Sequence, residues 1–195
     1  MHPFRHLATV CRHRRLVRRL CRRAGIGWQG LVHDLSKFSP TEFFAGAKYY
    51  QGTRSPNEGE RETLGYSLAW LHHKGRNRHH YEYWRDIDPA TRTYGPVEMP
   101  VKYTAEMFCD RVAASMVYRG DAYQTGDPLA YFLRGEAKNL MHPKTAALLE
   151  SWLTSLAEEG EDAALRRVKA AVGAARTARR RKKNADGGTP NPAGQ

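Results

Sequence analysis

Residues 3–24, PFRHLATVCRHRRLVRRLCRRA, place an apolar or histidine side chain at every third or fourth position. The positions of this stripe are His6, Val10, His13, Val17, Leu20 and Ala24. An α-helix repeats every 3.6 residues, so these side chains share one face and most arginines lie on the other. The segment is predicted to form a helix that buries its stripe and ends at Gly25 and Gly27.

Helical signals continue along the rest of the chain. Ser-Pro-x-Glu at Ser39 and at Ser55 is typical of a helix start, with serine at the N-cap, proline in the first turn and glutamate two residues later. Helices are predicted over 29–37, 40–50, 56–73, 78–86 and 100–118, from Asp127, and over 143–159 and 161–183, with a loop over 87–99. No alternating strand pattern of useful length is present, so the predicted fold class is all-α.

Charge is concentrated at the two ends of this chain of 195 residues, whose net charge is +12. Residues 1–23 hold eight arginines and residues 166–183 hold nine lysines or arginines, with no acid in either stretch. A uniformly basic nucleic-acid-binding domain would look different, so the ends predict at most weak, nonspecific nucleic-acid contact. There is no apolar run of membrane length and no signal-peptide pattern, which predicts a cytoplasmic protein. The three cysteines lack CxxC spacing, which predicts buried thiols rather than a disulfide framework or a zinc finger.

Metal-binding residue types recur at four places. His13 lies on the first stripe, with His6 as its rival; His33-Asp34 lies in an apolar helix; and Asp110 lies on an apolar helix face. A buried carboxylate needs a partner, which is either a cation or, for Asp110, an arginine such as Arg111 or Arg119. A single histidine of this kind is more often a half-buried, hydrogen-bonded side chain than a ligand.

The segment 70–84, WLHHKGRNRHHYEYW, is the densest in such residues, with four histidines flanking a turn. Buried imidazoles each need a polar partner, so an ordinary core does not gather them. The alternative is an aromatic-rich surface segment that contacts nucleic acid. Spacing does not choose between the pair His72 and His79 and the pair His73 and His80, because both are seven residues apart.

The order of these residues, His13…His33-Asp34…His73…His80…Asp110, resembles the HD superfamily of metal-dependent phosphohydrolases. The His33-Asp34-Leu35-Ser36-Lys37 form is similar to that of HD-GYP phosphodiesterases and of di-iron oxygenases such as myo-inositol oxygenase. More narrowly, GLVHDLSKFSPTEF, AWLHHKGRNRHHYEYW and MPVKYTAEMFCDRVAAS resemble an uncharacterised family of small bacterial and phage proteins. The resemblance implies an HD-like helical bundle over 1–160. After it, the composition predicts a basic helix over 161–183 and a disordered tail over 184–195.

The superfamily's roles imply a metal site with one or two divalent transition-metal ions such as Mn²⁺ or Fe²⁺. The implied metal ligands are His13, His33, Asp34, His73, His80 and Asp110. Lys37 and Asp34 take catalytic roles, and the substrate-binding residues are His72, Arg76, Asn77 and His79. Two-metal relatives usually space the middle histidines further apart, which counts against a second ion.

The implied activity is hydrolysis of a phosphate ester, with a small phosphorylated, nucleotide-like substrate. Two functions of other kinds stay open from the sequence. One is a di-iron oxygenase that acts on a small polar substrate, and the other is a helical protein that binds nucleic acid without catalysis.

Overall fold

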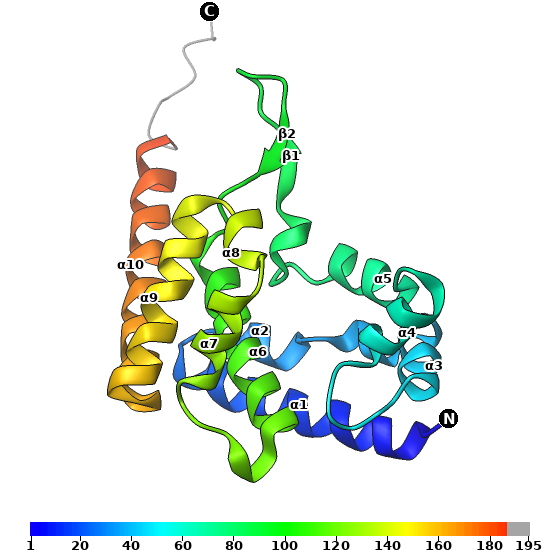
Figure 1. Cartoon of the computed structure of the whole chain (residues 1–195). Coiled ribbons are helices and arrows are strands. Elements are labelled where there is room, and N and C mark those ends of the chain that lie inside the picture. Colours follow the sequence, from blue (N-terminus) through cyan, green and yellow to red (C-terminus); the bar gives the residue numbers. More distant parts are fainter. Residues whose placement is uncertain (187–195) are drawn as a thin grey trace, which may run out of the picture.

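The computed structural model describes residues 1–186, and it confirms the all-α fold class (Figure 1). The helices are α1 (Pro3–Arg23), α2 (Gly27–Val32), α3 (Pro40–Lys48), α4 (Pro56–Leu64), α5 (Leu68–Arg76), α6 (Val101–Arg119), α7 (Asp127–Arg134), α8 (Ala137–Leu140), α9 (Pro143–Glu159) and α10 (Glu161–Asp186). Three single turns of 3₁₀-helix are η1 (Leu35–Phe38), η2 (Tyr81–Tyr83) and η3 (Gly120–Ala122). No helix in this part of the chain combines the length and apolar character needed to cross a membrane.

The first helix forms as its stripe predicts. All six stripe residues are buried, five in α1 and the sixth, Ala24, at its C-cap. The chain leaves the helix through Gly25 at a positive φ of 77°. The predicted helix over 56–73 is wrong, because it divides into α4 and α5. Gly65 ends α4 at φ 80°, and Ser67 then caps α5 by accepting a hydrogen bond from the backbone of Trp70.

A small β-hairpin occupies part of the predicted loop. Strand β1 (Arg85–Ile87) pairs antiparallel with β2 (Tyr94–Pro96), and Asp86 lies opposite Gly95. The predicted helix over 78–86 is also wrong, because only the single turn η2 forms there before the chain becomes extended. Three-residue strands are too short to produce a recognisable alternation in the sequence. In Figure 1 the hairpin projects from the helical body.

The apolar core lies on one side of the molecule. Its side chains come mainly from the C-terminal half of α1 and from α6, α7, α9 and α10. Helices α3, α4 and α5 form the opposite side, and α1 runs beneath both (Figure 1). In α3–α5 the only buried hydrophobic residues are Ala47 and Ala69, whereas Glu42, Glu60 and His73 are buried polar residues. The two sides therefore meet at a polar interface.

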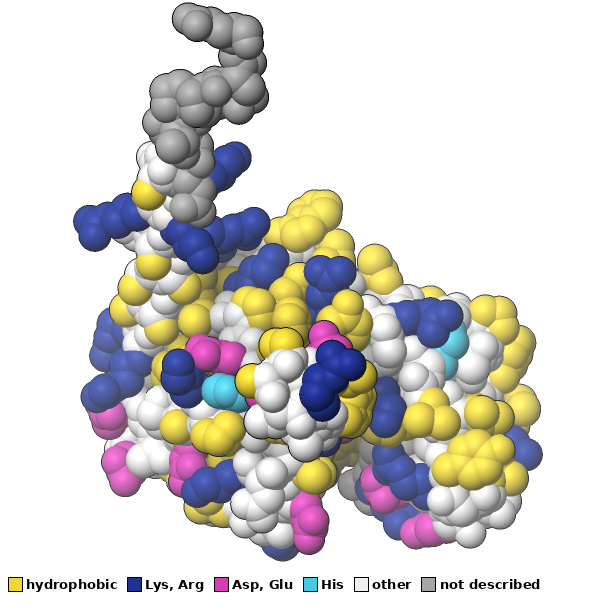
Figure 2. All heavy atoms as spheres, turned by 90° about the horizontal axis from the view of Figure 1, so that it is seen from above, with side chains coloured by type: hydrophobic (Ala, Val, Ile, Leu, Met, Phe, Trp, Pro, Cys, Tyr) yellow, Lys and Arg dark blue, Asp and Glu magenta, His cyan; other side chains and the backbone are white. Residues whose placement is uncertain are grey.

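Helix α10 has two distinct parts. Ala164, Leu165, Val168 and Val172 are buried in the core, so the first half of the helix belongs to the body. The second half is exposed and basic, with Arg176 and the run Arg179–Lys183. Figure 2 shows Lys and Arg side chains around this end of the helix. Residues 184–186 of the predicted tail continue α10, and residues 187–195 lie outside the described residues.

Candidate metal centre

His33 and Asp34 lie at a break in the chain, which corrects the predicted helix over 29–37. Helix α2 ends at Val32, His33 is extended, and Asp34 adopts the left-handed conformation at φ 53°. Consecutive side chains on a helix diverge, so this break is what directs both toward one point. Arg14 stabilises it by donating from Nε to the His33 carbonyl at 2.8 Å. A non-glycine residue at positive φ is uncommon, and aspartate is one of the residues that adopt this conformation most readily.

The first donor group consists of His13, His33, Asp34 and Asp110, which come from α1, the break and α6. His13 Nε2 lies 3.0 Å from Asp110 Oδ1, and His33 Nε2 lies 3.3 Å from Asp34 Oδ2. The two Nε2 atoms are 3.4 Å apart. Ligands about 2.1 Å from one transition-metal ion are separated by about 3.0–3.4 Å when they are neighbours, so this group fits an ion.

The second donor group consists of Asp34, His73, His79 and His80, from the break, α5 and the turn after it. His73 Nε2 and His79 Nε2 lie 3.3 and 3.4 Å from Asp34 Oδ1. Among the described residues, Asp34 Oδ1, His79 Nε2 and His80 Nε2 are buried and lack a hydrogen-bond partner. Unpartnered buried polar atoms are costly, and a cation between them would satisfy all three.

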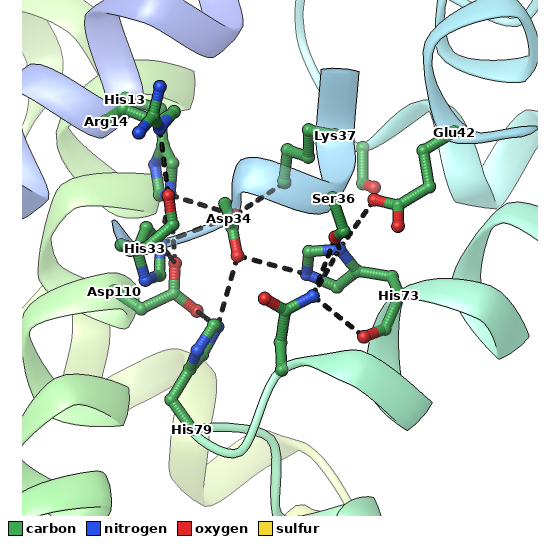
Figure 3. A network of polar contacts seen from close by, with 12 residues as sticks. His13, Arg14, His33, Asp34, Ser36, Lys37, Glu42, His73, His79 and Asp110 are labelled. Carbon is green, nitrogen blue, oxygen red and sulfur yellow. Dashed lines mark hydrogen bonds and ion pairs between the residues drawn. The ribbon is translucent and has the colours of Figure 1, made fainter. Parts of the chain in front are cut away.

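Asp34 belongs to both groups. Its Oδ2 faces His33 and its Oδ1 faces His73 and His79, so each carboxylate oxygen is directed to one group (Figure 3). Lys37 Nζ contacts Oδ2 at 3.1 Å. These two groups could therefore hold ions on opposite sides of the Asp34 carboxylate.

Two glutamates orient the imidazoles from behind. Glu106 Oε1 lies 3.0 Å from His33 Nδ1 and 3.1 Å from His79 Nδ1, one histidine from each group. Glu42 Oε2 lies 2.7 Å from His73 Nδ1. When Nδ1 donates to a carboxylate, Nε2 carries the lone pair that binds a metal. Neither glutamate is predicted from the sequence to contact these histidines.

A signal for Glu106 exists in the sequence, since it precedes Asp110 by one turn of the same helix. The sequence predicts that Glu42 is the glutamate of a capping box that begins at Ser39. Ser39 does accept from the Glu42 backbone, but the Glu42 carboxylate contacts His72 and His73 instead.

Electrostatics keeps the two carboxylates ionised in the metal-free protein. Burial opposes the charge on Asp34, but His33, Lys37 and His73 outweigh it and lower the pKa of Asp34 well below its usual value. Burial likewise opposes the charge on Asp110, and hydrogen bonds to His13 and His33 lower the pKa of Asp110.

The histidines divide into two kinds. Burial lowers the pKa of His13 and, together with His79, that of His80, so these imidazoles are neutral. Burial also opposes the charge on His33, but Asp34 and the other carboxylates around it raise its pKa well above the usual value. A bound cation would take the place of that proton, because ligation requires the neutral imidazole.

The structure separates the alternatives left open for the histidines. His6 lies outside both groups and packs against Gly46, Phe43 and Tyr50, so His13 is the histidine of α1 that belongs to the first donor group. His72 points away to Glu42, whereas His73, His79 and His80 all enter the second group.

Of the residues predicted to bind substrate, His79 therefore lies among the donors. The Asn77 side chain donates to Ser36 Oγ and to the His73 carbonyl, both at 2.8 Å. Arg76 is exposed and donates to the His72 carbonyl. Asp110 forms no ion pair with Arg111 or Arg119 among the described residues, and it contacts His13 instead.

A cavity of about 940 Å³ adjoins both donor groups. His13, Asp34, Lys37, His73, His80 and Asp110 contribute to its wall. Its size lies at the upper end of the range for small-molecule sites.

Comparison with protein families identifies a family for this chain. The model described as "Family of unknown function (DUF5662)" matches residues 2–155. The chain belongs to this family. The matched stretch of this DUF5662 protein contains every donor of both groups. No curated protein and no solved structure shows significant similarity to the chain.

Substitution of Glu106 and of Glu42 should lower the metal affinity of this DUF5662 protein to different extents. Glu106→Gln should weaken binding of two Mn²⁺ ions by about 10- to 100-fold each, because it orients one histidine of each group. Glu42→Gln should weaken the binding of only one ion, because Glu42 contacts only His73 among the donors. Calorimetric titration with Mn²⁺ measures both affinities.

The matched control is Glu158→Gln, which removes the same charge from an exposed position on α9. It should leave both affinities unchanged. Equal effects of Glu106→Gln and Glu42→Gln on both ions would contradict the assignment of the two groups.

Proposed function

We propose that this protein is a metal-dependent phosphohydrolase of the HD type that uses two divalent first-row transition-metal ions. The observation that carries the proposal is Asp34, whose two carboxylate oxygens belong to separate four-residue donor groups. The short spacing of the middle histidines does not oppose a second ion here, because the turn after α5 brings His79 and His80 back toward His73.

The donor set suits ions such as Mn²⁺ or Fe²⁺, since it combines five imidazoles with two carboxylates. His13, His33, Asp34 and Asp110 would hold one ion, and Asp34, His73, His79 and His80 the other. A bound divalent cation would act as a Lewis acid that lowers the pKa of a water molecule, so that hydroxide is available near neutral pH.

Lys37 is the residue of this chain that is best placed to stabilise a phosphoryl group. It lines the cavity and contacts Asp34, and about a third of its side chain is exposed. Burial opposes its charge, but Asp34 raises the pKa of Lys37 above its usual value, so the ammonium stays protonated. A fixed cation beside the reacting group stabilises the negative charge that develops in phosphoryl transfer.

A second candidate function is that of a di-iron oxygenase acting on a small polar substrate. The histidine-rich donor set around a shared carboxylate favours it, because such a set also suits two irons. Two irons would supply activation of dioxygen, and Lys37 would then hold a polar group of the substrate. Phosphate release and oxygen uptake separate the two functions.

The test compares wild type with Lys37→Met, each loaded with Mn²⁺ and, in parallel without oxygen, with Fe²⁺. We expect wild type to release p-nitrophenol from p-nitrophenyl phosphate or from its bis-ester. Lys37→Met should lower kcat by about 100-fold without changing the metal content, because it removes one electrostatic stabiliser.

Substrate-dependent oxygen uptake by the iron form, without hydrolysis, would favour the oxygenase. A metal-loaded protein with neither activity toward a broad panel of phosphate esters and polyols would contradict both functions.

A further inference from the structure

The cavity extends beyond the two donor groups along α6. Met107, Asp110, Arg111, Ala114, Ser115 and Tyr118 of this helix all line it. Tyr81, Glu82 and residues of α7 and α8 also line this cavity. The donor groups do not use this region, so it is available to the part of a substrate that does not react.

Arg111 is unusual among the arginines of this cavity. Its Nε atom is buried and has no hydrogen-bond partner among residues 1–186, and within the same range it forms no ion pair. The guanidinium lies over the ring of Phe132, with its central carbon 5.5 Å from the ring centroid. By contrast, Arg54 pairs with Glu62, and Arg119 pairs with Asp127 at 3.3 Å. Arg134 also lines the cavity without an ion pair among the described residues, but it is exposed.

The surroundings of Arg111 explain why it lacks a partner. The neighbouring carboxylate, Asp110, is directed to His13 and His33. Glu82 lines the same cavity, but it is not paired with Arg111, and its Oε2 is likewise buried without a hydrogen-bond partner among the described residues. An unpaired guanidinium in a partly desolvated wall is costly, so a group that supplies the missing acceptor would be stabilised there.

We propose that Arg111 binds a second anionic group of the substrate, a phosphate or a carboxylate, while the phosphate to be hydrolysed lies at the two ions. This inference rests on the proposed function and specifies its substrate class. The planar guanidinium offers several N–H donors to two oxygens at once, which suits phosphate and carboxylate. Glu82 would accept a hydrogen bond from a hydroxyl or amino group next to that anion.

The experiment measures how much a second anion adds to binding. Methylphosphonate and a series of α,ω-alkylene diphosphonates are titrated into the Mn²⁺-loaded protein by calorimetry. In wild type, the diphosphonate of the best length should bind about 10- to 100-fold more tightly than methylphosphonate. Arg111→Met should abolish that advantage and leave methylphosphonate binding unchanged, while Arg111→Lys should keep part of it.

Arg119→Met is the matched control, because Arg119 lines the same cavity but already has an acidic partner. It should keep the full advantage of the diphosphonate. A wild type that prefers no diphosphonate, or an Arg111→Met variant that keeps the preference, would overturn this inference and leave the proposed function intact. Failure of methylphosphonate itself to bind the metal-loaded wild type would count against the proposed function.

Thermal unfolding gives a second readout that does not depend on the phosphonates. If Arg111 binds a ligand and has no structural partner, Arg111→Met removes an unpaired charge. The Tm of the ligand-free variant should then be no lower than that of ligand-free wild type. If Arg111 instead forms a structural pair with Glu82, Arg111→Met and Glu82→Gln should each lower Tm by several degrees, which would overturn the inference.

Discussion

Asp34→Asn is expected to leave the protein folded but with neither ion bound tightly and with activity lowered at least about 1000-fold. Asp34 supplies one oxygen to each donor group, so its replacement by a neutral amide should weaken the binding of both ions. Loss of metal assistance removes several kcal/mol of transition-state stabilisation, and each 1.36 kcal/mol is tenfold in rate. Elemental analysis after gel filtration, together with the p-nitrophenyl phosphate assay, measures both effects.

Asparagine is the informative replacement because it adopts the left-handed conformation about as readily as aspartate, so the break before η1 should persist. Asp121→Asn, at an exposed position in η3, is the control for a lost carboxylate and should behave as wild type. An Asp34→Asn protein that retains two ions per chain would show that Asp34 does not bridge them.

Removal of metal is expected to loosen α3–α5 and leave α6–α10 intact. Only Ala47 and Ala69 are buried hydrophobic residues in α3–α5, so this side contributes little to the apolar core. Polar contacts such as those of His73 with Asp34 and Glu42 link it to the rest of the site. An ion present at 100–1000 times its Kd adds about 2.7–4.1 kcal/mol of stability, so its removal should speed local amide exchange by about 100- to 1000-fold.

Hydrogen exchange measured with and without a chelator tests this expectation. Amides over 40–80 should lose protection, while those of α9 and the first half of α10 should exchange as before, since their side chains lie in the apolar core. His13→Ala, which disturbs only the first group, should loosen α3–α5 less than chelation does. Uniform loss of protection over the whole chain, or none, would contradict a metal-held interface.

Much of the helical framework could be predicted from the sequence because its signals are local. The stripe of α1 depends only on a 3.6-residue period, and α9 begins and ends where its pattern predicts. His13, His33, Asp34 and Asp110 could each be singled out because acids and imidazoles in apolar stretches need partners. That they act together as metal ligands is implied only by the resemblance to the HD superfamily.

The parts that could not be predicted depend on contacts between distant segments. Asp34 adopts the left-handed conformation at a break that Arg14 of α1 stabilises. The residues near Asp34 in the sequence do not predict this conformation. Glu106 lies one turn before Asp110, but its contacts with His33 and His79 depend on segments that are distant in the sequence. The same holds for Glu42, whose position in a capping box predicts that its side chain reaches back to the backbone N–H of Ser39.

The most direct test of the shared-carboxylate centre is an anomalous-difference map from a crystal of the protein grown with Mn²⁺. Two peaks are predicted on either side of Asp34, one among His13, His33 and Asp110 and the other among His73, His79 and His80. A map without a peak at Asp34, with these side chains directed to separate places, would contradict the account.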